Sequence, residues 1–191
     1  YSTLNNNAYG NMSGTSMSAP HISGAMSVIR EALKKDLPAI SGKDSVEFAK
    51  ISAMNTAKPQ YETPQAGMEA RPFSPRRQGA GMLQLNEAVR NRINVTHNGE
   101  ASVALKEIKS DKVSFELDIK NYGNKDATYT LGVEGGVLTN NVQNNVAQIT
   151  PYDDVLPQDK ANLSFSDKEI TIKANSSRKV TVTLSLKDVN S

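Results

Sequence analysis

The chain has 191 residues, and its 22 lysines and arginines nearly balance 20 aspartates and glutamates, which gives a net charge of +2. This balance argues against a nucleic-acid-binding protein, which usually presents a strongly basic face. Cysteine is absent, which excludes disulfides, thiolate metal sites and cysteine nucleophiles. No stretch approaches the roughly 18 apolar residues of a membrane-spanning helix, so we expect no membrane span in this chain.

Apolar residues in the first half of the chain recur at helical spacing. Steps of three and four residues predict helices over 16–35 and 43–55, and a third, shorter helix over 83–90. Residues 58–81 hold four prolines and several glycines, so we expect a long irregular crossing there. Three helices joined in this way do not form a self-sufficient core.

The pattern changes near residue 97 from a period of 3.6 residues to a period of two. Alternating apolar residues predict strands over 113–119 and 180–186. Weaker patterns of the same kind mark strands at 101–108, 128–134 and 169–174. We interpret residues 98–191 as an antiparallel β-sandwich that is cut short, because about five or six strands are visible and a sandwich of seven needs one or two more. The polar insert 135–154 is expected to be a mobile surface loop.

The segment with the most chemical content is residues 14–24, which read GTSMSAPHISG. Its small residues permit a sharp turn directly before the first predicted helix. A serine at this junction, Ser16, has its hydroxyl at the positive end of the helix, among backbone N–H groups that lack helical partners. Such groups can stabilise an oxyanion in acyl transfer. Pro20 suits this place because the first turn of a helix needs no hydrogen bond from a proline nitrogen.

A serine at a helix start is usually a simple N-cap residue, preceded here by the turn residues Gly14 and Thr15. The full eleven-residue string instead resembles the nucleophile segment of the subtilisin-like serine proteases (subtilases), whose pattern is Gly-Thr-Ser-Met-(Ala/Ser)-x-Pro-His-(Val/Ile)-x-Gly. The resemblance implies that Ser16 is the catalytic nucleophile and that its backbone N–H contributes to the oxyanion hole. It also implies that four residues support this motif: Gly14, Thr15, Met17 and Pro20.

A second segment extends the resemblance. Residues 73–81 read FSPRRQGAG and lead into the third predicted helix, which is similar to the cell-envelope proteinase and C5a peptidase group of subtilases. In that group a fibronectin-III-like sandwich follows the catalytic domain. The resemblance thus implies that residues 1–97 are the C-terminal helical portion of an α/β subtilisin-like catalytic domain, and that residues 98–191 are an all-β fibronectin-III-like sandwich. Residues 1–97 would then be stable only with a parallel sheet from missing upstream sequence.

The family order places a catalytic Asp, a catalytic His and an oxyanion-hole Asn before the serine. Ser16 leaves no room for them upstream, and neither histidine of this chain is a convincing base. His21 matches the family's non-catalytic histidine, and His97 is expected in a turn at the domain junction. Because a general base must reach hydrogen-bond distance of the nucleophile, this chain alone is expected to be inactive.

Two charged clusters are interpreted as solvated surface. A basic cluster consists of Arg71, Arg76 and Arg77, and we prefer a solvated loop over a surface that binds an acidic patch or a substrate. An acidic cluster consists of Asp153, Asp154 and Asp159. Its spacing fits no EF-hand, so a solvated loop is again preferred over a calcium site. The sequence therefore predicts no cofactor and no metal in this chain, and leaves calcium open for the parent protein.

These features predict a fragment of a secreted or cell-wall-attached serine endopeptidase of Gram-positive bacterial type. Ser16 would attack peptide bonds of protein or peptide substrates to form an acyl-enzyme. The Asp, His and oxyanion Asn would come from the missing N-terminal part of the catalytic domain. The partners expected for this chain are therefore that missing part and the protein or peptide substrates. The alternative is a non-catalytic surface adhesion or spacer module with a vestigial protease segment. The intact motif around Ser16 argues against decay.

Overall fold

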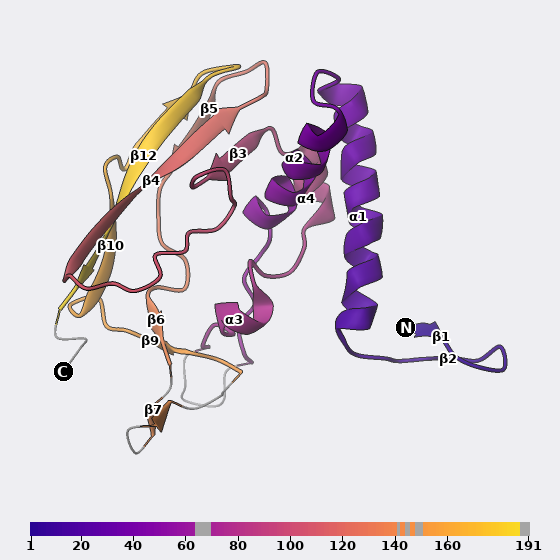
Figure 1. The fold of residues 1–191 in the computed structure, drawn as a ribbon, viewed down its shortest axis with the longest axis horizontal. Helices are drawn as coiled ribbons and strands as arrows, with labels where there is room; N and C mark the ends of the chain where they lie inside the picture. The colour runs from indigo at the N-terminus through magenta and orange to yellow at the C-terminus, as the bar shows by residue number, and fades with distance from the viewer. Residues whose placement is uncertain (64–69, 141, 144–145, 148–150, 188–191) are drawn as a thin grey trace.

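The structure, a computed structural model, describes residues 1–63, 70–140, 142–143, 146–147 and 151–187. Figure 1 shows a group of helices at one side of the molecule and long strands at the other, with the two termini on opposite sides of the view. Within the described ranges, no helix is long and apolar enough to cross a membrane.

All three predicted helices are present. They are α1 (Thr15–Asp36), α2 (Gly42–Asn55) and α4 (Leu85–Arg90). The prediction of a wholly irregular crossing was wrong, because a short helix, α3 (Pro75–Gln78), lies inside it. A proline suits the first position of a helix, since its fixed φ is already helical and its missing N–H is not needed there. Residues 64–69 of the crossing lie outside the described residues.

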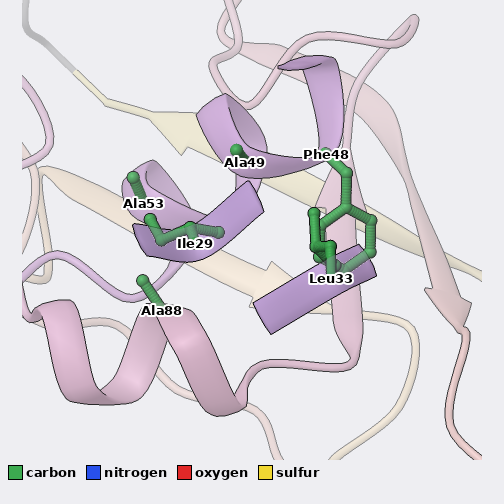
Figure 2. Close-up of a cluster of buried hydrophobic side chains, with 6 residues drawn as sticks. All are labelled: Ile29, Leu33, Phe48, Ala49, Ala53 and Ala88. Carbon is green, nitrogen blue, oxygen red and sulfur yellow. The ribbon is translucent and has the colours of Figure 1, made fainter. Parts of the chain in front are cut away.

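The helices pack through one small core. Its buried side chains come from α1, α2 and α4, and Figure 2 shows them converging: Ile29, Leu33, Phe48, Ala49, Ala53 and Ala88. Burial of an isoleucine such as Ile29 contributes roughly 1.5–3 kcal/mol, so this core holds the C-terminal half of α1 in place. The N-terminal half lacks such cover. Ile22, which shares a helical face with Ile29, is 45% exposed.

Two antiparallel sheets form the core of the second half of the chain. The larger sheet has the strand order β10-β12-β4-β3, and the smaller pairs β5 with β11. The strands are β3 (Ile93–Thr96), β4 (Lys112–Asn121), β5 (Ala127–Thr130), β10 (Ala161–Phe165), β11 (Glu169–Ile172) and β12 (Ser177–Leu186). Side chains from both sheets share one core, formed by Ile93, Ile119, Ile170, Ile172 and Val180. The strands predicted around 113–119 and 180–186 are confirmed as β4 and β12.

Some strands differ from the sequence prediction. The prediction of a strand over 101–108 was wrong: the backbone there is irregular, and Lys106 has a left-handed φ of +57°, which interrupts an extended chain. Alternation of apolar residues did not indicate β3 or β10, which have only four and five residues. Strand β3 lies ahead of residue 97 and pairs with β4. The larger sheet therefore begins before residue 98, where the sandwich was expected to start. The position of the domain boundary stays a prediction.

The polar insert 135–154 contains short paired strands in place of the expected loop. Strand β6 (Leu138–Thr139) pairs with β9 (Asp154–Val155), and β7 (Val142–Gln143) pairs with β8 (Val146–Ala147). Residues 141, 144–145 and 148–150 of the insert lie outside the described residues.

A short hairpin, whose strands have two residues each, precedes α1. It pairs β1 (Ser2–Thr3) with β2 (Tyr9–Gly10). The rings of Tyr1 and Tyr9 stack with their centroids 6.0 Å apart, yet both remain largely exposed. This hairpin therefore contributes little to the helical core.

Side chains of α2 join the helices to the sandwich. The Asn55 amide accepts the N–H of Val95 at 2.7 Å and donates to the Val95 carbonyl at 3.1 Å. One turn earlier, Lys50 Nζ lies 2.8 Å from a carboxylate oxygen of Glu100. That hydrogen bond raises the pKa of Lys50 and lowers the pKa of Glu100. Helix α2 thus contacts both α1 and the edge strand of the larger sheet.

Candidate active site

Gly14 determines where α1 begins. Its φ of 151° and ψ of 167° lie in a region that is essentially restricted to glycine. Its carbonyl accepts the N–H groups of Met17 and Ser18 at 3.0 and 3.2 Å, which closes the first helical turn. Thr15 is therefore the first helical residue and Ser16 the second. The small residues predicted to make a sharp turn do so through this one backbone conformation.

Ser16 lies exposed at the positive end of a long helix. Helix α1 has 22 residues and no acidic side chain in its first turn, so no carboxylate offsets the partial positive charge there. Among the described residues, the N–H groups of Thr15 and Ser16 have no hydrogen-bond acceptor. An oxyanion placed beside Ser16 would meet free backbone donors, as acyl transfer requires.

Pro20 lies one turn further along α1 than the sequence interpretation assumed. The helix begins at Thr15, so Pro20 is its sixth residue and lies in the second turn. A residue at this position would normally donate its N–H to the carbonyl of Ser16, four residues earlier. Proline has no N–H, so the explanation based on the first turn was wrong. The consequence is that the Ser16 carbonyl lacks the hydrogen bond that a residue four positions later would donate.

His21 is bound to its own helix. Its Nδ1 lies 2.7 Å from the carbonyl oxygen of Met17, and because a carbonyl only accepts, this ring nitrogen carries the hydrogen. The side chain is exposed and follows Ser16 by five residues on α1. The contact holds the ring against its own helix, and the non-catalytic role of His21 stays a prediction.

His97 lies in a turn of the sandwich, as predicted. Its backbone pairs with Glu100 around Asn98 and Gly99. Its Nδ1 donates to the carbonyl of Glu116 at 2.8 Å, and its Nε2 accepts from the Asn98 amide at 3.1 Å. Both ring nitrogens are therefore engaged within the sandwich. Within the described part of the chain, neither histidine forms a hydrogen bond with Ser16.

The two charged clusters contact each other, so their interpretation as separate solvated loops was wrong for four of the six residues. Arg76 Nη2 lies 2.9 Å from Asp153 Oδ1, and the Asp153 side chain is only 8% exposed. Arg71 Nη1 lies 3.6 Å from Asp154 Oδ1. We call these two pairs the arginine–aspartate latch, since they join the α3 segment to the insert of the sandwich. Of the six residues in the two clusters, only Arg77 and Asp159 are exposed and have no ion pair with a described residue.

Neighbouring contacts reinforce the latch. The Arg71 guanidinium lies 3.6 Å from the centroid of the Tyr152 ring, which is a cation–π contact. Arg71 Nε also bonds to Glu62 at 2.5 Å, and this hydrogen bond raises the pKa of Arg71. The Ser74 N–H donates to the carbonyl of Pro151 at 3.0 Å. Sequence patterns could not reveal these pairs, because their members lie far apart in the chain.

The described residues offer no metal site: none of them form a group of three or more His, Cys, Asp or Glu side chains able to hold an ion.

The fold and the site together define a class of protein. The chain has helices that follow a Gly-Thr-Ser-Met turn, and an antiparallel sandwich comes after them. This arrangement corresponds to the serine-bearing end of a subtilisin-like domain joined to a fibronectin-III-like module. Residues 1–81 match the model of the subtilase family, and residues 103–191 match that of the Fn3-like domain. Residues 1–81 thus belong to the subtilase family, and an Fn3-like domain follows them.

Several proteinases are similar to nearly the whole chain. A PII-type proteinase of Lacticaseibacillus paracasei is 32% identical over 200 residues, which cover 97% of this chain and 10% of that protein. A C5a peptidase of Streptococcus pyogenes serotype M1 is 31% identical over 183 residues, which cover 95% of this chain and 14% of that protein. A PI-type proteinase of Lactococcus lactis subsp. cremoris is 32% identical over 97% of this chain and 10% of its own length. The chain thus spans only 10–14% of the length of these relatives.

Proposed function

We propose that the chain is the nucleophile-bearing segment of a serine endopeptidase. The observation that carries this proposal is the exposed Ser16, next to free backbone N–H groups at the start of a 22-residue helix. Ser16 Oγ attacks the carbonyl carbon of a peptide bond, and the amine half of the substrate leaves from the resulting tetrahedral intermediate. The acyl-enzyme that remains is then hydrolysed. The Ser16 N–H donates to the oxyanion at each step.

The rest of the catalytic machinery lies outside this chain. A general base must reach Ser16 within hydrogen-bond distance, but His21 is bound to its own helix and His97 to the sandwich. The proposal therefore assigns the base His, its orienting Asp and an oxyanion Asn to upstream sequence of the longer protein. Residues 1–191 alone are inactive under this proposal.

The substrates and location follow from the relatives. Proteins named C5a peptidase and PII-type proteinase act on polypeptides, so the substrates proposed here are proteins or peptides. Similarity to proteins of Streptococcus and Lacticaseibacillus supports a secreted or wall-attached enzyme of a Gram-positive bacterium. In such an enzyme the sandwich braces the catalytic domain, through Asn55 and the latch.

Labelling with a fluorophosphonate tests this proposal in the longer protein. The reagent reacts with an activated serine, so the peptide containing Ser16 is expected to carry the label. Ser16→Ala should abolish labelling, whereas Ser18→Ala should retain it. Ser18 is the matched control because it lies on the same exposed helical turn and bonds only weakly, at 3.4 Å, to the Gly14 carbonyl.

The alternative spacer function predicts a different result. A folded longer protein that takes up no label at Ser16, and whose upstream sequence lacks an Asp and a His in subtilase contexts, would contradict the protease proposal. Label on a serine other than Ser16 would contradict the assignment of the nucleophile.

A further inference from the structure

The turn after β3 places an exposed asparagine directly before a glycine. Asn98 and Gly99 have left-handed φ values of +51° and +84°, as the two central residues of a tight hairpin turn require. Two backbone hydrogen bonds close this turn: the His97 N–H donates to the Glu100 carbonyl at 2.8 Å, and the Glu100 N–H donates to the His97 carbonyl at 3.0 Å. Asn98, Gly99 and Glu100 are all exposed, so solvent reaches the asparagine side chain and the backbone that follows it.

The backbone nitrogen of Gly99 is unprotected. No oxygen of the described residues accepts its N–H group. The space beside it is open as well, because no described atom other than those of its chain neighbours lies within 4 Å of the place that a Cβ of this residue would take. A glycine also has no side chain of its own to hinder an approach to the nitrogen. The side-chain carbonyl carbon of Asn98 can therefore reach this nitrogen without displacing another group from it.

Asn175 provides a comparison within the same sandwich. It is also exposed, and it has a similar left-handed φ of +53°. The residue after it is Ser176, whose N–H donates to the Lys173 carbonyl at 3.2 Å and whose hydroxyl donates to the same carbonyl at 2.8 Å. The two asparagines therefore resemble each other in backbone and exposure, and they differ in whether the nitrogen that follows is free or bonded.

We propose that Asn98 is a site of spontaneous modification, at which the side-chain amide is lost and a carboxylate takes its place. The Gly99 nitrogen gives its proton to a base in solution and attacks Asn98 Cγ, and the new N–Cγ bond closes a five-membered succinimide ring. The Cγ–Nδ2 bond breaks, and Nδ2 takes up a proton from water and leaves as ammonia. Water then adds to one of the two ring carbonyl carbons and opens the ring, which gives aspartate or isoaspartate at position 98. This inference does not depend on the role of Ser16.

The turn must open before the ring can close. The succinimide fixes the rotation between Cα and the carbonyl carbon of residue 98 at a value that differs from that of the turn. The hydrogen bond from Asn98 Nδ2 to His97 Nε2, at 3.1 Å, must also break. Short exposed turns held by few hydrogen bonds open locally at small cost, so these contacts slow the reaction without preventing it.

The modification weakens a contact between the sandwich and α2. A carboxylate has no N–H, so the hydrogen bond to His97 Nε2 is lost. Isoaspartate also adds a carbon atom to the main chain, so the two backbone hydrogen bonds of the turn no longer both form. These bonds hold Glu100 where its carboxylate binds Lys50 of α2 at 2.8 Å. The attachment of α2 to the sandwich therefore loosens as the protein ages.

Peptide mapping by mass spectrometry tests the proposal on the longer protein, aged at mildly alkaline pH. Asn98 should convert at least about tenfold faster than Asn175, which corresponds to about 1.4 kcal/mol in activation free energy. Gly99→Ser should slow the conversion of Asn98 by at least about tenfold. Ser176→Gly is the matched control, because it gives Asn175 the same following residue but retains a nitrogen bonded to the Lys173 carbonyl. In this variant Asn175 should still convert at least about threefold more slowly than Asn98.

Three outcomes would contradict the proposal. Equal conversion of Asn98 and Asn175 in the unsubstituted protein would overturn it. Equal rates at the two sites in Ser176→Gly would show that the asparagine–glycine dipeptide alone decides the rate and that the free nitrogen of the turn contributes nothing. Hydrogen exchange measures the consequence: the Glu100 amide should exchange faster in aged than in fresh protein, whereas Asn98→Gln aged in the same way should show no change. An unchanged Glu100 amide after conversion would disprove the loosening.

Discussion

Gly14 shows how one backbone conformation positions a reactive side chain. Its φ and ψ are essentially restricted to glycine, and its carbonyl accepts the N–H groups of Met17 and Ser18. The residue that follows two positions later is Ser16. Any side chain at position 14 would force the backbone into another region and would change the place at which α1 begins.

We predict that Gly14→Ala slows the labelling of Ser16 by fluorophosphonate in the longer protein by at least about tenfold. The strain at this φ costs about 1–3 kcal/mol, and about 1.4 kcal/mol corresponds to a factor of ten in rate. Ser13→Ala is the control, since Ser13 has no left-handed φ and adds no new Cβ. Equal labelling rates for the two variants would show that the turn tolerates a side chain.

Asp126 gives the sandwich a dependence on pH. A hydrogen bond from Lys173 and a second one from the Ala174 N–H lower the pKa of its carboxyl group. A pKa that is lower in the folded state contributes stability above the ordinary pKa of an aspartate, and this contribution is lost as the pH falls through the folded-state value. The loss is therefore confined to acidic conditions, below about pH 4.

We predict that Asp126→Asn makes the stability of the sandwich less sensitive to acid. The variant should be less stable than the parent at pH 7, and the difference should shrink as the pH falls below about 4. Urea unfolding at a series of pH values measures both effects. Asp159→Asn is the control, because Asp159 is exposed and has no ion pair among the described residues. A difference that grew on acidification would contradict this assignment.

At the scale of elements, the sequence predicts best where a period extends over several turns or residues. Helices α1 and α2 end within one residue of their predicted limits, since their apolar faces repeat at helical spacing. Strand β3 has only four residues, too few for alternation to be distinguished from chance. The residues of the candidate site also differ in how far they can be predicted from the sequence. A local motif identified Ser16, whereas the pairing of Arg76 with Asp153 depends on residues 77 positions apart.

The latch joins α3 to the sandwich insert, and its members can be tested separately. We predict that Arg76→Gln lowers the free energy of unfolding by about 1–2 kcal/mol. The substitution leaves the buried Asp153 carboxylate without its partner, and the exposure of Arg76 keeps the loss below that of a fully buried pair. Arg77→Gln, the next residue of the same helix, should change stability by less than about 0.5 kcal/mol. Calorimetry of both variants in the longer protein measures the difference, and equal losses would show that the pair contributes nothing specific.

At the scale of the whole molecule, much apolar surface near the N-terminus is uncovered. The large exposed side chains there include Tyr1 at 86%, Tyr9 at 63% and Ile22 at 45%. Where large apolar side chains are exposed together, they usually mark a contact with another part of a protein. Because the core of α1 reaches only its C-terminal half, the helices have little tertiary contact with which to form a cooperative unit.

We therefore predict that residues 1–191 lose their helical signal gradually on heating, without a sharp transition in circular dichroism. They should also bind the dye ANS, whereas the longer protein should melt cooperatively and bind little dye. A single sharp helical transition of residues 1–191 would show that the helices are stable without upstream sequence.

The two hydrogen bonds between Asn55 and Val95 cover part of an exposed strand edge. An edge strand with unpaired N–H and C=O groups is a template for pairing with other chains. Asn55 presents one donor and one acceptor to β3, as a neighbouring strand would, and it occupies the groups of Val95 on the outer side of the larger sheet. The β3 edge of the larger sheet is thus covered at Val95 by a side chain of α2, whereas β10, the other edge strand of that sheet, has only β12 as a neighbour.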